Sequence, residues 1–261
     1  MAGRRGRGYG RGVPDMVITD PRLARIYDAF DGERHDLPAY LGIIEELGAR
    51  RVLDIGCGTG CLAVRLAERG IEVVGVDPSG ASVAVARTKE HAGKITWVVG
   101  GVDAAPDMAA DLAVMTGNVA QVFGSDESWH HTLDAIHARL RPGGHLVFET
   151  RRPARKAWVD WAKSEPVTLD IPGIGAVREI LDVTEVALPF VSFRHTYHFP
   201  DGETRTEDSR LRFRDEDELR ASLTARGYRV VDVREAPDRP GREFVFIAER
   251  ISSPTGDMHR P

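Results

Sequence analysis

The period of the hydrophobic pattern changes twice along this chain, near residue 50 and near residue 165. Before residue 50, apolar residues recur at helical spacing over 21–30 and 37–47, which predicts two helices. Thr19 or Asp20 can cap the first helix, and Pro21 suits its first position. The part of the fold before residue 50 is therefore expected to be helical.

Between residues 51 and 150, short apolar runs alternate with amphipathic segments. Five apolar runs predict strands, at 51–55, 71–77, 95–100, 111–116 and 145–150. Three amphipathic segments predict helices, at 60–69, 79–92 and 128–140. Strands that alternate with helices favour a parallel sheet with helices on both faces.

Beyond residue 150 this alternation stops, and a short helix is expected at 154–163. Longer segments of alternating polarity then predict three antiparallel strands, at 176–187, 190–199 and 203–213. Turn signals at Leu188-Pro189 and Asp201-Gly202 separate these strands. The last elements are a predicted helix at 215–227 and predicted strands at 228–233 and 243–249.

Together these elements predict an α/β fold. It is a doubly wound, mostly parallel seven-stranded sheet with an antiparallel β insertion after the fifth strand. We expect a core domain of residues 19–150 and 214–250 and an insertion of residues 151–213. Residues 1–18 are expected to form a disordered basic tail, and residues 251–261 a frayed end.

Composition restricts the class of protein. The chain has 261 residues, 42% of them hydrophobic, but no run of about 18 apolar residues that could span a membrane. The N-terminus lacks the apolar segment of a secretory signal, and Cys57 and Cys61 are the only cysteines. We therefore expect a cytoplasmic protein without a membrane partner.

Charge is distributed unevenly along the chain. Residues 1–14 carry Arg4, Arg5, Arg7 and Arg11 and no acid, so this tail holds +4 of the net charge of −5 and the rest carries −9. An acidic body offers no broad cationic surface to a phosphate backbone. Nucleic acid is therefore not the expected partner, although a short Arg-Gly tail can bind RNA and keeps that alternative open.

The strongest chemical signal is the loop that follows the first predicted strand. Asp54 ends the strand, and three glycines lead into the next helix with the spacing D-x-G-x-G-x-G. Glycines let a ligand approach the backbone closely, and a helix N-terminus offers free N–H groups. The dinucleotide pattern G-x-G-x-x-G would need a glycine at position 61, where Cys61 stands.

This loop resembles the glycine loop of class I S-adenosylmethionine-dependent methyltransferases, which have a Rossmann-like fold. The resemblance covers about residues 37–150 and includes the turn at 116–121 and the phrase Arg-Pro-Gly-Gly-His-Leu at 141–146. It implies S-adenosylmethionine as cofactor and S-adenosylhomocysteine as product. The acid before the glycines suits the positively charged methionine end of the cofactor.

The resemblance also implies which residues contact the cofactor. Asp77 can accept hydrogen bonds from both ribose hydroxyls, and Asp103 matches the acid that holds the adenine amino group. The turn after the fourth strand lies beside the transferred methyl group in this family, and an N-terminal aromatic residue often covers the methionine part. The full expected set is Tyr27, Asp54, Gly56, Cys57, Gly58, Gly60, Asp77, Pro78, Asp103, Ala104, Thr116, Gly117 and Asn118.

A small molecule is the expected acceptor, methylated on oxygen or nitrogen by direct displacement. Enzymes of this fold that methylate the exocyclic amino groups of bases or glutamine amides usually carry an Asn- or Asp-Pro-Pro-aromatic turn, whereas residues 117–120 read Gly-Asn-Val-Ala. Cytosine-C5 enzymes use a Pro-Cys nucleophile, which this chain lacks. The alternatives are an RNA methyltransferase that uses the Arg-Gly tail and a non-catalytic module that binds S-adenosylmethionine.

The insertion is expected to act as a lid over the acceptor. Along its middle strand, His195 shares a face with aromatic residues, so we expect it to face the acceptor as a base or an orienting group. The competing interpretation is a hydrogen-bonded core histidine. Gln121, Arg151 and Tyr197 are expected to contact the acceptor. No metal site is expected, and the expected state is a monomer or a homodimer.

Overall fold

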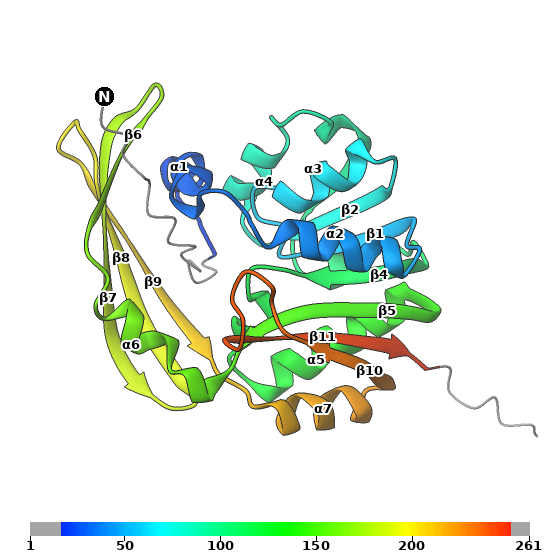
Figure 1. Cartoon of the computed structure of the whole chain (residues 1–261). Helices are drawn as coiled ribbons and strands as arrows, with labels where there is room; N and C mark the ends of the chain where they lie inside the picture. The colour runs from blue at the N-terminus through cyan, green and yellow to red at the C-terminus, as the bar shows by residue number, and fades with distance from the viewer. Residues whose placement is uncertain (1–16, 252–261) are drawn as a thin grey trace, which may run out of the picture.

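The computed structural model describes residues 17–251 of the chain (Figure 1). The predicted tail up to residue 16 and the predicted frayed end from residue 252 lie outside these residues. Ile18, which the sequence places in the tail, is buried in an apolar cluster. Within residues 17–251, no helix combines the length and apolar character needed to cross a membrane.

The predicted seven-stranded sheet is confirmed, in the order β10-β11-β5-β4-β1-β2-β3. Strands β1 to β5 are parallel, and β11 and β10 are antiparallel to their neighbours. The bounds are β1 Arg51–Ile55, β2 Glu72–Asp77, β3 Ile95–Val99, β4 Ala110–Met115, β5 Leu140–Arg151, β10 Tyr228–Arg234 and β11 Glu243–Arg250.

Helices cover both faces of this sheet (Figure 1). Alternate strand residues point to opposite faces, so Leu53 packs in the cluster that contains α5 and α7, whereas Val52 packs with α2 and α3. The bounds are α1 Pro21–Asp31, α2 Leu37–Glu46, α3 Cys61–Glu68, α4 Gly80–Ala86, α5 Asp126–Arg139, α6 Ala157–Trp161 and α7 Glu216–Ala225. Short 3-10 turns are η1 Ala92–Lys94, η2 Val102–Ala104, η3 Val119–Gln121 and η4 Pro153–Arg155.

The antiparallel insertion forms a second sheet, which confirms that part of the predicted fold. Its order is β6-β7-β8-β9, with bounds β6 Val167–Ile171, β7 Gly175–Ala187, β8 Phe190–His198 and β9 Thr204–Arg212. The sequence predicts only the last three of these strands. The missed strand, β6, is five residues long with only one buried residue, so it carries a weak pattern.

Three predicted boundaries differ from the structure for local reasons. Strand β5 begins at Leu140, because the Pro-Gly-Gly segment lies within the strand as an irregularity, with Gly143 at a φ of 72° and a register shift against β4 between Leu140 and His145. Helix α5 begins at Asp126, earlier than predicted, since Ser125 caps it and Ser128 completes a capping box. Helix α4 ends at Ala86, well before the predicted residue 92.

Helix α1 packs between the two sheets (Figure 1). Its apolar face shares a buried cluster with β6, β7 and β8, and the rings of Phe30 and Tyr197 meet edge to face, 5.5 Å apart. Arg22 forms ion pairs with Asp201 and Glu203 in the turn between β8 and β9. The second sheet is therefore fixed to the helix that also borders the main cavity.

Candidate active site

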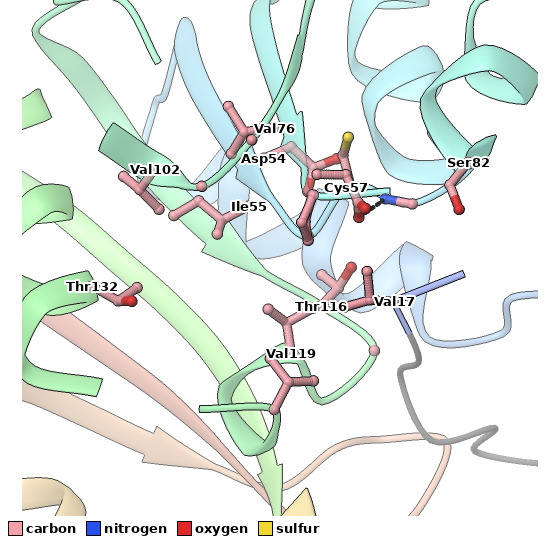
Figure 2. A pocket seen from close by; sticks show the side chains of 18 of the residues that line it. Val17, Asp54, Ile55, Cys57, Val76, Ser82, Val102, Thr116, Val119 and Thr132 are labelled. Carbon is pink, nitrogen blue, oxygen red and sulfur yellow. Dashed lines mark hydrogen bonds between the residues drawn. The ribbon is translucent and has the colours of Figure 1, made fainter. Parts of the chain in front are cut away.

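A cavity of about 300 Å³ lies at the carboxyl ends of β1, β2 and β4. The loops after these strands, helix α1 and the start of α5 contribute its walls. Figure 2 shows Asp54 and Cys57 above Thr116 and Val119 in that view, around a common space. Ligands of open α/β sheets bind at this edge of the strands, so the position is the one expected for a small-molecule site.

Ten of the thirteen predicted cofactor residues line this cavity. They are Tyr27, Asp54, Gly56, Cys57, Gly58, Asp77, Pro78, Asp103, Thr116 and Gly117. The other three, Gly60, Ala104 and Asn118, lie outside its lining. The cavity therefore gathers side chains that the sequence separates by nearly a hundred residues.

The glycine loop brings backbone to the cavity wall. Gly56 and Gly58 have positive φ angles of 65° and 52°, which L-residues with side chains rarely adopt. A Cβ atom on Gly56 would lie 2.4 Å from Val119, whereas one on Gly58 would meet nothing within 4 Å. Glycine at 56 is thus needed for packing against the turn after β4, and glycine at 58 leaves the cavity side open.

Asp54 is the most unusual group in the cavity wall. It is the fourth residue of the five-residue strand β1 and is only 2% exposed, and its Oδ2 atom is buried without a hydrogen-bond partner among residues 17–251. Burial raises the pKa of this carboxyl to about 7. A buried acceptor without a donor costs free energy, so this oxygen is suited to a ligand that brings a donor or a positive charge.

Asp77, at the end of β2, joins the glycine loop to the start of α4 through its two carboxylate oxygens. Its Oδ2 accepts the Gly58 N–H at 2.8 Å, and its Oδ1 accepts the Ser79 N–H at 2.7 Å. Burial raises the pKa of Asp77 above its ordinary value. Each carboxylate oxygen can accept a second hydrogen bond, so both remain able to accept a ligand hydroxyl.

Asp103 differs from these two acids because its side chain is 62% exposed. It lies at the rim of the cavity, where its Oδ2 is 2.7 Å from Nε2 of His131, and both residues line the cavity. The surrounding wall is formed by apolar and hydroxyl side chains of η2 and α5, including Val102 and Thr132 (Figure 2). This end of the cavity suits a flat ring that carries polar atoms at its edge.

The turn after β4 is held from behind by a buried carboxylate. Glu149, on β5, is fully buried, and its Oε1 accepts the N–H of Gly117 at 2.7 Å and of Asn118 at 3.0 Å. Burial, and then the charge of Glu243, raises the pKa of Glu149 to about 7. The amide nitrogen of Asn118 also donates to Glu243, at 3.2 Å, so this side chain is used in the support of the turn.

Sequence reasoning missed several residues of the wall. Arg34, in the loop between α1 and α2, lines the cavity while it donates two hydrogen bonds to Asp36 at 2.8 and 2.6 Å. Val17, Ile18 and His131 also line it. No periodic or motif signal marks Arg34 or Val17, whereas His131 lies on the exposed side of a predicted helix and could have been found there.

The predicted acceptor residues lie outside the lining of this cavity. Arg151 donates to the side-chain oxygen of Gln121 at 2.9 Å, behind the turn after β4. His195 and Tyr197 lie on β8, where His195 is 1% exposed and its Nδ1 is 2.9 Å from Glu179. Their roles toward an acceptor stay predictions. Within residues 17–251 there is no cluster of three or more potential metal ligands.

Comparisons with known sequences point to one family. A family model described as "Methyltransferase domain" matches residues 29–233. Glycine N-methyltransferase of Rattus norvegicus is 31% identical over 161 residues, which are 54% of this chain and 55% of that protein. A ubiquinone biosynthesis O-methyltransferase of Alkalilimnicola ehrlichii is 33% identical over 129 residues, 43% of this chain and 46% of that protein. The chain thus spans about half the length of the curated relatives it matches.

Solved structures share the fold at low sequence identity. The sugar N-methyltransferase KedS8 from Streptoalloteichus superposes with a TM-score of 0.73 at 17% identity, covering 97% of this chain and 99% of that one. CalS10, an amino pentose methyltransferase from Micromonospora echinaspora, was solved with S-adenosylmethionine bound. It gives a TM-score of 0.70 at 21% identity, covering 88% of this chain and 96% of that one. At these identities the likeness establishes the fold alone.

Proposed function

Since the chain belongs to the methyltransferase-domain family, we propose that it binds S-adenosylmethionine in this cavity and transfers the methyl group to a small molecule. The family model matches most of the chain, and the cavity lies where ligands of such sheets bind. S-adenosylmethionine supplies a methyl group on a positively charged sulfur. The remaining steps of the proposal concern what the residues of this chain do around it.

The observation that carries the proposal is the unpartnered oxygen of Asp54. This buried carboxyl keeps Oδ2 without a donor inside the cavity wall. The ammonium group of a methionine moiety would supply the missing donor and a positive charge. A charge-assisted hydrogen bond of this kind is worth about 1.5–3 kcal/mol, so it would offset much of the cost of burying the acid.

Three other side chains of the wall fit the remaining parts of the cofactor. Asp77 would accept hydrogen bonds from the ribose hydroxyls, and Asp103 would accept one from the adenine amino group. Arg34 would bind the methionine carboxylate, because it is the cationic side chain that lines the cavity together with Asp54. The proposed cofactor therefore lies along the carboxyl edge of the sheet, with its charged end near α1.

The residues beside the transferred group have a positioning role. Thr116, Gly117 and Val119 form the wall opposite the glycine loop, and the turn that carries them is held rigidly by Glu149. Direct displacement at carbon needs alignment of donor, carbon and nucleophile more than it needs a catalytic acid or base. We propose an oxygen or nitrogen atom of the acceptor as the nucleophile.

Calorimetric titration of the full chain with S-adenosylhomocysteine tests this function, with NAD as the competing ligand. We expect one molecule of S-adenosylhomocysteine per chain and no saturable heat with NAD. The D54N variant should bind about 30-fold more weakly, because it loses the charged partner of the ammonium group. D107N, which removes an exposed acid outside the lining, is the control. Binding of NAD instead would contradict the proposal.

A further inference from the structure

Four polar side chains meet on the face of the second sheet that packs toward α1. Nδ1 of His195 lies 2.9 Å from Oε1 of Glu179, and the hydroxyl of Tyr197 donates to the same oxygen at 3.2 Å. Glu207 is paired directly with His195 across β8 and β9, so it shares this face. We call these four residues, Glu179, His195, Tyr197 and Glu207, the β8 cluster.

The β8 cluster holds two buried polar atoms that have no hydrogen-bond partner among residues 17–251. They are Nε2 of His195 and Oε2 of Glu207, and the His195 residue is only 1% exposed. Because Nδ1 of His195 faces a carboxylate, that nitrogen carries the proton and Nε2 is left with a lone pair. Buried atoms of this kind need a partner, which indicates a ligand that donates hydrogen bonds.

Packing connects the β8 cluster to the cofactor cavity from two sides. Tyr197 shares an apolar cluster with Tyr27, and Phe193 shares another with Val122. Tyr27 and Val122 both line the cavity. His195 stands between Phe193 and Tyr197 on the same face of β8, so its ring is directed to the side of the sheet that faces the cavity.

We propose that the β8 cluster binds the acceptor through an amine, and that this nitrogen receives the methyl group. The inference rests on the proposed methyl transfer and adds the chemical class of its acceptor. Two carboxylates, Glu179 and Glu207, attract an ammonium ion, whereas a neutral hydroxyl gains little from them. The ring of Tyr197, whose centroid lies 5.9 Å from that of His195, adds an aromatic face that favours a cation.

The same geometry supplies the proton transfer that an ammonium group needs before it can react. The ammonium nitrogen gives one proton to Nε2 of His195, and Glu179 stabilises the resulting imidazolium through Nδ1–H. The freed lone pair then forms the new nitrogen–carbon bond. The electron pair of the broken sulfur–carbon bond stays with the sulfur, so charge and atoms balance. In this step His195 acts as the base, and Glu179 holds it in the required tautomer.

Matched pairs of amines and alcohols test the inference. The full chain is saturated with S-adenosylhomocysteine and titrated calorimetrically with glucosamine and glucose, and with 2-phenylethylamine and 2-phenylethanol. At least one amine should bind about 10-fold more tightly than its alcohol, which is the effect of one charged hydrogen bond. Equal or weaker binding of both amines relative to their alcohols would overturn the inference.

Variants then assign the preference to the β8 cluster. E179Q should reduce the preference for the amine to less than about 3-fold, because it removes one of the two charges. D208N is the matched control, since Asp208 lies on the same sheet, pairs with Arg194 and is 63% exposed. D208N should keep the preference. A preference that persists in E179Q would overturn the assignment.

A second variant, H195Q, keeps the inference testable if E179Q does not fold. H195Q keeps a hydrogen-bonding group near the position of Nε2 but cannot take up a proton at neutral pH. With the preferred amine and S-adenosylmethionine, H195Q should lower kcat about 100-fold with little change in KM, and unchanged kcat would count against the base. Retained binding of S-adenosylhomocysteine in both variants separates these outcomes from a failure of the proposed function, in which that ligand would not bind at all.

Discussion

Asp54 combines a buried position with an oxygen that no group in the described part of the chain, residues 17–251, satisfies. Its pKa of about 7 lies well above the ordinary value of about 3.9, and the physical cause is burial. Between these two values the folded state keeps the proton while the unfolded state releases it. Rising pH therefore removes stability from the unliganded protein between about pH 4 and pH 7.

The D54N variant lacks this titrating carboxyl, so the stability of the two proteins should depend differently on pH. Its free energy of unfolding relative to the wild type should increase by about 2 kcal/mol between pH 5 and pH 8, in the absence of ligand. Urea denaturation of both proteins at the two pH values measures this change. If the free energies of unfolding of the two proteins changed equally between pH 5 and pH 8, Asp54 would not be buried as a neutral acid in the unliganded protein.

Two glycines of the same loop give a prediction about stability. Gly60 has a φ of 81°, and a Cβ there would lie 2.5 Å from Trp97, whereas Gly58 has open space beside it. G58A should cost about 1 kcal/mol through backbone strain alone. G60A should cost about 3 kcal/mol, because overpacking adds to the strain. Similar midpoints in urea denaturation for the two variants would be evidence against the close packing of Gly60 on Trp97.

Among the elements, strand β5 supports the turn after β4. Glu149 on β5 accepts the backbone N–H groups of Gly117 and Asn118, and its second oxygen accepts from the hydroxyl of Tyr40. The sequence places Asn118 at the cofactor, but its side chain donates to Glu149 and Glu243. The site is therefore shaped by an acid that the sequence motif does not contain.

Substitutions of Glu149 test this support. E149A leaves two buried N–H groups without an acceptor, so it should weaken binding of S-adenosylhomocysteine about 10-fold and cost about 3 kcal/mol of stability. E149Q keeps an oxygen for both N–H groups and should bind within about 3-fold of the wild type. Y40F removes only the hydroxyl partner and serves as the control. If E149A bound the ligand as tightly as E149Q does, the support would be unimportant for the site.

The elements also show where sequence patterns suffice. Strong hydrophobic patterns predicted the seven strands of the main sheet. Five of them, β1 to β5, are parallel, and buried parallel strands are short apolar runs. Strand β6 was missed because only Ile171 in it is buried. The start of β5 was missed because glycine and proline at 142–144 usually interrupt strands, and here they continue one.

At the scale of the whole molecule, the sequence motif predicted residues that line one cavity better than it predicted contacts between distant segments. Asp54, Gly56 and Asp77 follow a fixed local spacing, and the structure brings them to one cavity. Glu149 supports the turn after β4 through contacts between distant segments, and Arg34 lines the cavity from a loop in which no local pattern marks it. The position of His195 beside Glu179 and Glu207 likewise follows from strand register, which the sequence alone does not specify.

At this scale the molecule consists of a cavity-bearing sheet and a second sheet joined to it through α1 (Figure 1). Tyr27 and Phe30 of α1 pack with the second sheet, and Tyr27 also lines the cavity. A ligand that reaches Tyr27 therefore contacts a helix that the second sheet covers. This arrangement gives the two sheets different tasks in the proposed function, cofactor binding and acceptor binding.

A crystal structure of the full chain with S-adenosylhomocysteine tests the proposed site most directly. We expect the methionine ammonium group at Oδ2 of Asp54, the ribose hydroxyls at Asp77 and the sulfur directed toward the side of the cavity that the second sheet covers. A ligand bound elsewhere, or bound in the cavity with its adenine at Asp54, would contradict it.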